Sequence, residues 1–510
     1  MFKIKVFFFT ILSFVSIASA EPYINTSDIS LKASINHLAN AGHINTPINT
    51  YPLMWVDIHT ALKKIDLTQL NNSEKQSYFY INDAFYKARR KNLTLTANTS
   101  TAAKRFTSFG DDFRNKNNIT LSASSVSDYI AYKLSPSITS SSLEGDNIQF
   151  NDSYVALRLG NWNLSLGTQD RWWGPGWDSN IGLTNNARPI LSAAITRNVA
   201  IPFTVPFTNN YQVPWNVTSF MGKMEADRHI PNTLLWGFRL SFIPIENLEV
   251  SIIRLAQWGG ENRSKSLSTF IDLFLGKDNC GVGGLDCGVN KENEPGNQQA
   301  GFDFRYSFNF QNAPMSFYGQ YFGEDGNADN GLNFITKPAV QLGLDGQASL
   351  FNQPLTWFAE YNGTYEICGK EKVIGDCFFE HHIYQTGMRY KNRNIGHLYD
   401  NDAESIVLGM IGQTESGIKW DTRLRYVELN KDNIKNQLEG AVIFGMSIAL
   451  YGKISAKEGA VEQHNFFDYE MTRMKDAPNI HIEIMDKMHE PPTGVGEPGV
   501  PVMAPAICNA

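Results

Sequence analysis

The residues from Gly301 to Phe310 alternate between large apolar and polar side chains without a break. Successive side chains of a β-strand point to opposite faces of its sheet, so this stretch predicts a strand with one aromatic face. The aromatic face comprises Phe302, Phe304, Tyr306, Phe308 and Phe310, and the polar face comprises Asp303, Arg305, Ser307 and Asn309. Similar alternation recurs at residues 154–159, 236–242 and 420–426. Charges opposite aromatics are typical of a barrel with an apolar exterior and a wet lumen, although a core strand of a sandwich has the same pattern.

The rest of the 510-residue chain is compatible with a membrane-spanning barrel. After the N-terminus, no apolar run approaches the roughly 18–20 residues that a membrane-spanning helix needs. Segments with strand periodicity between residues 92 and 452 number about eighteen, and tight turns alternate with long connections. The chain is therefore predicted to be mainly β. We expect a transmembrane antiparallel β-barrel with short periplasmic turns and long external loops.

The first twenty residues have the parts of a secretory signal peptide. Lys3 and Lys5 precede an apolar core, and Ala18-Ser19-Ala20 forms a small-residue cleavage site. The mature chain is therefore predicted to begin at Glu21. The formal net charge of −7 argues against nucleic acid as a partner.

Four regions are expected along the chain. They are a signal peptide (1–20), a periplasmic helical domain (21–91), an outer-membrane β-barrel with long external loops (92–453) and a C-terminal tail (454–510). The helical domain is expected because amphipathic patterns occupy residues 28–41, 53–65 and 73–90. The tail is rich in Pro and Gly near its end, which predicts a partly extended or disordered segment.

The cysteine spacing predicts two local disulfides. Cys280 and Cys287 lie close together in one polar loop, and Cys368 and Cys377 lie close together in another. In an exported protein such pairs favour disulfides, and metal binding is the alternative. No histidine pattern accompanies the cysteines to support a metal site. Cys508 is left over, either free or bonded elsewhere.

Three of the ten tryptophans lie within six residues, at Trp172, Trp173 and Trp177. Gly and Pro between them prevent a regular element, so the segment is a shaped loop. Its polar members are Asp170, Arg171, Asp178, Asn185, Asn186 and Arg188. Aromatic faces beside polar groups suit a sugar, because the C–H face of a pyranose lies on a ring while its hydroxyls need partners. The alternative is that the tryptophans plug the loop into the protein interior, and the residues alone do not decide between the two.

A resemblance to Wzi-type capsule assembly proteins rests on two segments. The first is Arg171-Trp172-Trp173-Gly174-Pro175-Gly176-Trp177, followed by Asn185-Asn186-Ala187-Arg188-Pro189, and the second, weaker one is Tyr51-Pro52-Leu53-Met54-Trp55-Val56-Asp57-Ile58. The resemblance covers most of residues 21–455. It implies a lectin barrel in the outer membrane of a Gram-negative bacterium, with its N-terminal domain in the periplasm. The implied partners are capsular or other surface polysaccharide, outer-membrane lipid and capsule export machinery.

This resemblance suggests roles for the side chains of the loop. The tryptophans would stack on sugars, and the Asp and Asn residues would pair with hydroxyls. Arg171 and Arg188 would meet the carboxylates of an acidic polysaccharide. Five arginines are predicted to face the lumen: Arg158, Arg239, Arg305, Arg423 and Arg425. These arginines would extend a basic path or pair with lumen carboxylates to brace the wall, and bracing is favoured for most of them.

Two other functions are alternatives. A barrel of about eighteen strands is wide enough for a channel or polysaccharide exit pore, but long external loops and a helical plug favour occlusion. An enzyme is not expected, because no Gly-x-Ser-x-Gly elbow is present and carboxylate pairs arise by chance among 51 acidic residues. No cofactor and no metal site are expected, and His381-His382 is interpreted as a solvated pair.

Overall fold

The computed structural model describes residues 21–509 apart from 112, 141, 207, 209–210, 276–295, 312, 327–334, 351–352, 365–377, 415–416, 430, 464–469, 474–476 and 484–497. The barrel strands are β4 (Asn92–Thr99), β5 (Asn117–Val126), β6 (Ile130–Leu134), β7 (Ser137–Ser140), β8 (Ile148–Gln149), β9 (Ser153–Leu159), β10 (Trp162–Thr168), β12 (Ser192–Arg197), β15 (Trp215–Lys223), β16 (Leu234–Ile245), β17 (Leu248–Trp258), β18 (Gly296–Phe310), β19 (Ala313–Gly326), β20 (Ile335–Leu350), β21 (Gln353–Gly363), β24 (Ala403–Gln413) and β25 (Lys419–Leu429). The helices are α1 (Ile29–Asn40), α2 (Trp55–Leu62), α3 (Asn72–Ala88), α4 (Leu267–Phe274), α5 (Lys431–Tyr451) and α6 (Val500–Asn509). Short two-residue strands are β1 (Tyr23–Ile24), β2 (Thr50–Tyr51), β3 (Leu53–Met54), β11 (Trp172–Trp173), β13 (Phe203–Thr204), β14 (Gln212–Val213), β22 (Arg389–Tyr390), β23 (Arg393–Asn394), β26 (Ala456–Lys457) and β27 (Ala460–Val461).

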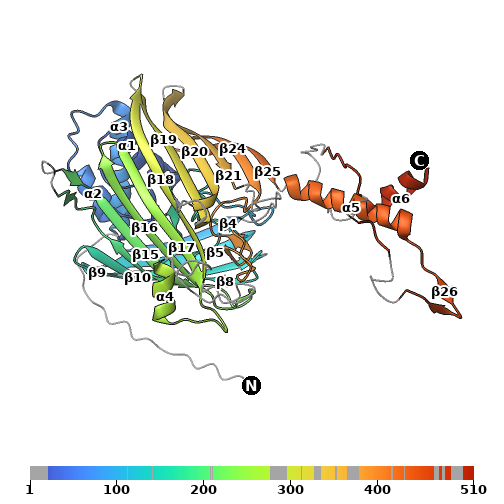
Figure 1. The fold of residues 1–510 in the computed structure, drawn as a ribbon. Coiled ribbons are helices and arrows are strands. Elements are labelled where there is room, and N and C mark those ends of the chain that lie inside the picture. Colours follow the sequence, from blue (N-terminus) through green and yellow to red (C-terminus); the bar gives the residue numbers. More distant parts are fainter. Residues whose placement is uncertain are drawn as a thin grey trace. The chain divides into compact units, whose positions relative to one another are not determined.

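The strands form a closed barrel, whose long strands β15 to β21 are prominent in Figure 1. The order around the wall is β10-β12-β15-β16-β17-β18-β19-β20-β21-β24-β25-β4-β5-β6-β7-β8-β9. Neighbouring strands from β15 to β24 pair antiparallel, each with the next. β5 pairs with β6 along one half and with β7 along the other. β6 pairs with β9, and β7 pairs with β8. In the wall, β6 and β7 therefore share one position, and β8 and β9 share the next. The predicted fold class, a mainly β antiparallel barrel, is confirmed, with 17 strand segments in the described part of the wall where about eighteen strands were expected.

The alternation along β18 separates a lipid-facing surface from the interior. Phe302 and Tyr306 are 46% and 44% exposed on the outer face of the wall, whereas Asp303 is fully buried on the inner face. Arg305 and Ser307 are likewise buried on the inner face. The charged face of each strand therefore points into a filled lumen, where the charges need partners from the protein.

Three N-terminal helices occupy the positions of the amphipathic patterns. The N-cap Asp28 accepts a hydrogen bond from the Leu31 amide at 3.0 Å, which begins α1. A capping box between Asn71 and Glu74 begins α3. These helices share one compact unit with the barrel wall. In the described part of the chain, every helix is too short or too polar to cross a membrane.

Helix α1 and the chain that follows it are bonded to the inner face of the wall. The Asn40 side chain donates to Asp345 of β20 at 2.8 Å and accepts from Ser307 of β18 at 3.0 Å. The Glu249 carboxylate of β17 accepts the backbone amides of Ile48 and Asn49 at 2.9 and 3.2 Å. The helices therefore plug the barrel from the end that carries the short turns, because Gly42 approaches Asn247 of the β16–β17 turn.

The C-terminal residues differ from the expected barrel boundary. The barrel was expected to extend to residue 453, but its last strand ends at Leu429 and residues 431–451 form α5. Glu428–Ala510 belong to a second compact unit, in which α5 packs on α6. A Cβ on Gly445 of α5 would lie 2.7 Å from the Cβ of Met503, so this packing needs glycine there. The apolar residues 441–451, which were expected to belong to the barrel, thus form the second half of a 21-residue helix.

Candidate functional site

The tryptophan segment (residues 169–189) lies inside the barrel. Trp172 and Trp177 are fully buried, and Trp173 is 1% exposed. The segment is held as a strand where β11 pairs with β2, with Trp172 opposite Tyr51. The Trp172 indole N–H donates to the Gly176 carbonyl at 2.9 Å. The segment therefore forms part of the interior packing between the N-terminal plug and the wall.

Trp177 has partners on both sides of its ring system. Its indole N–H donates to the Asp345 carboxylate at 3.0 Å, and its ring stacks on Phe358 with centroids 5.6 Å apart. The Glu360 carboxylate accepts the backbone amides of Trp177 and Asp178. A Cβ on Gly176 would lie 1.9 Å from the Ser179 carbonyl oxygen, so the tight turn beside Trp177 requires glycine.

Lys32 of α1 reaches into the same cluster. Its ammonium group donates to the Gly176 carbonyl at 2.5 Å. Its Nζ also lies 4.4 to 6.0 Å from the ring centroids of Tyr51, Phe109, Trp172 and Trp177. Burial lowers the pKa of Lys32 to about 7, although the negative charge of Glu360 acts in the other direction and raises it. The lysine thus ties the plug helix to the tryptophan segment through cation–π contacts and one hydrogen bond.

Asp178 connects the tryptophan segment to β25. Its carboxylate meets the guanidinium of Arg425 at 2.6 Å and that of Arg423 at 3.0 Å. Ser108 also donates to it at 3.0 Å. Burial alone would raise the pKa of Asp178, but the two guanidinium groups outweigh burial and lower it. Asp178 is therefore a paired internal anion.

The other polar residues of the segment bond to neighbouring connections. Asp170 meets Arg114 at 2.9 Å. Arg171 donates to Ser192 at 2.9 Å and lies over the Phe220 ring. The side-chain amides of Asn185 and Asn186 donate to the backbone carbonyls of Ser108 and Asn394 at 3.2 and 3.1 Å. These contacts join the tryptophan segment to the connection after β4 and to strands β12, β15 and β23.

Arg188 is the member of the segment that reaches the outer rim. It meets Glu144 at 3.2 Å and Asp146 at 2.7 Å, both from the β7–β8 connection. Lys391 also meets Asp146, whose side chain is 41% exposed. Arg393 meets Glu144 at 3.0 Å. These five residues form a cluster of mixed charge, which reaches solvent mainly through Asp146 and Lys391 and which we call the rim cluster.

Comparison with known proteins identifies the family to which this chain belongs. The family model described as "Capsule assembly protein Wzi" matches residues 86–477. The chain belongs to the Wzi capsule assembly family. It is a β-barrel of the Gram-negative outer membrane, in a family of non-catalytic, lectin-like barrels.

Two similar proteins cover most of the Wzi-family chain. An uncharacterised 55.8 kDa protein in the cps region of Klebsiella pneumoniae is 28% identical over 418 residues, 81% of this chain and 78% of that protein. The solved structure of Wzi from Escherichia coli matches with a TM-score of 0.69 at 25% identity, covering 81% of this chain and 87% of that one. It is described as an outer-membrane protein involved in group 1 capsule assembly and as a carbohydrate-binding β-barrel. A short match, 38% identical over 79 residues, links 16% of this chain to 10% of the isoquinoline 1-oxidoreductase β subunit of Brevundimonas diminuta.

The structure places the sugar-binding candidates of this Wzi-family protein mostly out of reach. A pyranose would contact Trp172, Trp173 or Trp177 only if the tryptophan segment left the interior. Stacking on these three rings therefore stays a prediction, and so do the hydroxyl contacts assigned to Asp170, Asp178, Asn185 and Asn186. Among the nine, the side chains of Asp170 and Arg188 keep some contact with solvent, at 22% and 11% exposed.

Four of the five lumen arginines form ion pairs. Arg239 meets Asp303 at 2.6 Å with both side chains fully buried. Arg305 meets Asp345 at 3.4 Å, and Arg423 and Arg425 share Asp178 as described above. Arg158 lies at the short-turn end of β9, where it donates to the Gly160 carbonyl at 3.4 Å. The ion pairs of Arg239 and Arg305 link strands of the wall, and those of Arg423 and Arg425 join β25 to the tryptophan segment.

The cysteine predictions fall largely outside the described residues. Cys280, Cys287 and Cys368 lie there, and so does Cys377, so the two predicted disulfides stay predictions. Cys508 of α6 is exposed and carries a free thiol. Within the described ranges, no group of three or more His, Cys, Asp or Glu side chains could hold a metal ion.

Sequence reasoning missed an exposed aromatic side chain in the connection after β4. Phe106 is 44% exposed and packs edge-on against Tyr399 of the connection before β24, with ring centroids 5.0 Å apart. Its neighbour Arg105 is also exposed. Both connections lie at the end opposite the short turns. A lone Phe in an irregular stretch carries no periodic signal, so only the folded loops reveal it.

Proposed function

We propose that this protein binds capsular or other surface polysaccharide without catalysis and helps to attach it to the cell surface. The carrying observation is its membership of the Wzi family, supported by a shared barrel with the carbohydrate-binding protein from Escherichia coli. Outer-membrane lipid surrounds the aromatic outer face, and docking of the periplasmic helices to capsule export machinery stays a prediction.

The filled lumen supports binding rather than conduction. Ion pairs of buried side chains, such as Arg239 with Asp303, occupy the interior together with α1 and the tryptophan segment. A polysaccharide exit pore would need a continuous wet passage between these groups. A steady ion current through the purified protein in planar bilayers would favour the channel alternative.

We place the sugar contacts on the outer connections. Phe106 offers an accessible ring for stacking on the C–H face of a sugar, with Arg105 beside it. Arg188 and Lys391 in the rim cluster would meet carboxylates of an acidic polymer by displacing Asp146, which is the most exposed anion there. Many barrels that hold one polymer gain avidity, so a modest affinity at each site is sufficient.

The test uses cells that lack this protein and are complemented with variants. Wild type should keep the polymer on the cells, and Phe106→Ala should shift it into the medium at unchanged total, because the stacking surface is lost. Tyr86→Ala, an exposed aromatic of α3 at the other end of the barrel, is the matched control and should behave as wild type. A fall in total polymer on deletion would indicate a role in synthesis or export and contradict the proposal.

A further inference from the structure

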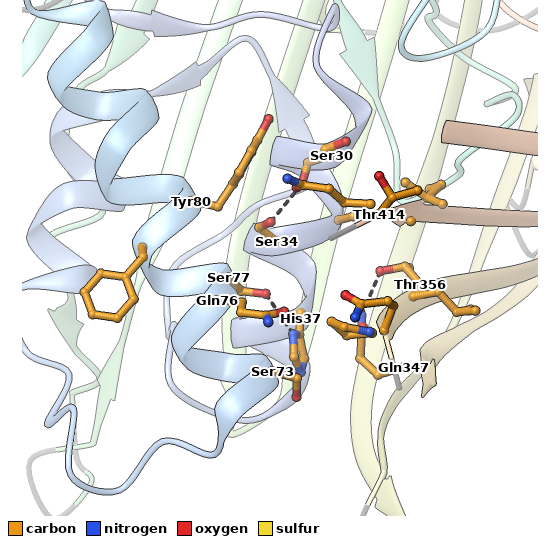
Figure 2. Close-up of a pocket in the computed structure, with 18 residues that line it drawn as sticks. Ser30, Ser34, His37, Ser73, Gln76, Ser77, Tyr80, Gln347, Thr356 and Thr414 are labelled. Carbon is orange, nitrogen blue, oxygen red and sulfur yellow. Dashed lines mark hydrogen bonds between the residues drawn. The ribbon is translucent and has the colours of Figure 1, made fainter. Parts of the chain in front are cut away.

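A large cavity lies between the N-terminal plug and the wall. Its volume is about 590 Å³, and its lining comes from α1, α3, β20, β21 and β24. In Figure 2, Gln76 and Ser77 of α3 face Gln347 and Thr356 of the wall, with His37 of α1 between them. The volume lies within the roughly 300–1,000 Å³ that is usual for ligand pockets. The cavity opens at the short-turn end of the barrel, which faces the periplasm in outer-membrane barrels.

The lining of this cavity mixes polar and apolar side chains and carries no Asp, Glu, Lys or Arg. Hydroxyl groups come from Ser30, Ser34, Ser73, Ser77, Tyr80, Thr356 and Thr414, and amides come from Gln76, Gln347, Gln353 and Gln413. Such groups donate and accept hydrogen bonds at many angles without a net charge. This chemistry matches a ligand with many hydroxyls and no charge, and it differs from the charged rim cluster at the other end.

His37 gives the cavity a buried polar atom that lacks a partner. The side chain is 2% exposed, and its Nδ1 lies 2.9 Å from the Ser77 hydroxyl. Its Nε2 is buried and has no hydrogen-bond partner among the described residues. Burial lowers the pKa of His37 to about 4, so the imidazole is neutral at neutral pH. A buried polar atom without a partner is costly, so His37 marks a place in the cavity wall where the packing leaves a hydrogen-bonding group unused.

Aromatic residues complete the site. Phe79 of α3 lines the cavity and is 56% exposed, so its ring is accessible to a ligand. The neighbouring Tyr80 is held by its hydroxyl, which donates to Asp28 at 2.7 Å. Rings beside hydroxyls and amides are the combination that recognises a pyranose.

We propose that this cavity is a second saccharide site, which binds a short uncharged stretch of a glycan on the periplasmic side of the barrel. The site goes beyond the proposed function, because it lies at the opposite end from the rim cluster and selects against charge. The proposal of this second site depends on the proposed function only in the choice of the glycan used as a probe.

The test measures binding of short glycan fragments to the full-length protein in a zwitterionic detergent without a sugar headgroup. The probes are fragments of the surface polysaccharide of the source bacterium, separated into neutral and acidic pools. Saturation-transfer NMR should show transfer to the neutral pool. The Gln76→Ala and Phe79→Ala variants should each lower the affinity at least about tenfold, which corresponds to the loss of one good contact. Both side chains are solvent-exposed, so neither substitution should unfold the protein.

Tyr86→Ala is the matched control, because Tyr86 is 50% exposed on the same helix and does not line the cavity. No transfer to the neutral pool, or transfer that survives Phe79→Ala, would overturn the second site. If Phe106→Ala alone abolishes fragment binding, the second site fails while the proposed function stands. If cells without the protein retain their polymer, the proposed function fails instead, and fragment binding at the cavity is judged separately.

Discussion

The replacement of Trp177 by Ala distinguishes two roles for this side chain, packing in the interior and stacking on a sugar. The ring is fully buried, and its indole N–H donates to Asp345 at 3.0 Å while it stacks on Phe358. Truncation of a buried Trp to Ala costs about 3–5 kcal/mol, since contacts are lost and a cavity remains. The equilibrium constant for folding should therefore fall by roughly two to three and a half orders of magnitude.

The conservative variant Trp177→Phe should lose only part of this stability. It keeps an aromatic ring over Phe358, but it loses the N–H donor and part of the indole volume. Asp345 retains hydrogen bonds from Asn40 and Ser316, both at 2.8 Å, so loss of the donor should cost about 1 kcal/mol, and the space left by the smaller ring adds to this cost. The expected order of stability is wild type, then Trp177→Phe, then Trp177→Ala.

The assay is guanidinium unfolding of the protein in detergent micelles, followed by the different mobility of folded and unfolded barrels on unheated gels. Polysaccharide retention is measured on cells that carry the same variants. A Trp177→Ala protein with the wild-type unfolding midpoint and defective retention would refute the plug argument. That result would mean that the tryptophan segment leaves the interior to bind sugar.

Two further predictions concern buried charge. Arg239→Met should destabilise the barrel by about 3–5 kcal/mol because Asp303 is left buried without a cation, and the double variant with Asp303→Leu should recover most of the loss in the same unfolding assay. Burial lowers the pKa of His37 from 6.5 to about 4, so the unfolded chain binds a proton that the folded chain excludes. Stability is therefore complete above pH 6.5 and falls toward pH 4, by about 2 kcal/mol between pH 7.5 and pH 5. Amide exchange in α1 should accelerate over this range in wild type and less in His37→Gln, and equal acceleration in both would contradict the assignment.

Local patterns predicted much of the architecture. The alternation in β18 identified both the outer face of Phe302 and the inner face of Asp303, because strand geometry fixes side-chain direction residue by residue. The end of the barrel was missed, since the helix formed by residues 431–451 packs on α6, which is a tertiary contact. The sequence predicted that the three tryptophans cluster with polar side chains, but it did not decide whether solvent can reach the cluster.

The sequence by itself determined the barrel, the helical plug and the motif that marks the family, because each depends on periodicity or on the order of neighbouring residues. Only the tertiary structure decided what the motif faces. Trp177 lies against Phe358 and Asp345, and Lys32 lies among four rings, through contacts between residues far apart in the chain. The same holds for the cavity beside His37, whose walls come from two helices and three strands. Burial depends on which distant segments meet, and the residue types of a loop do not specify that.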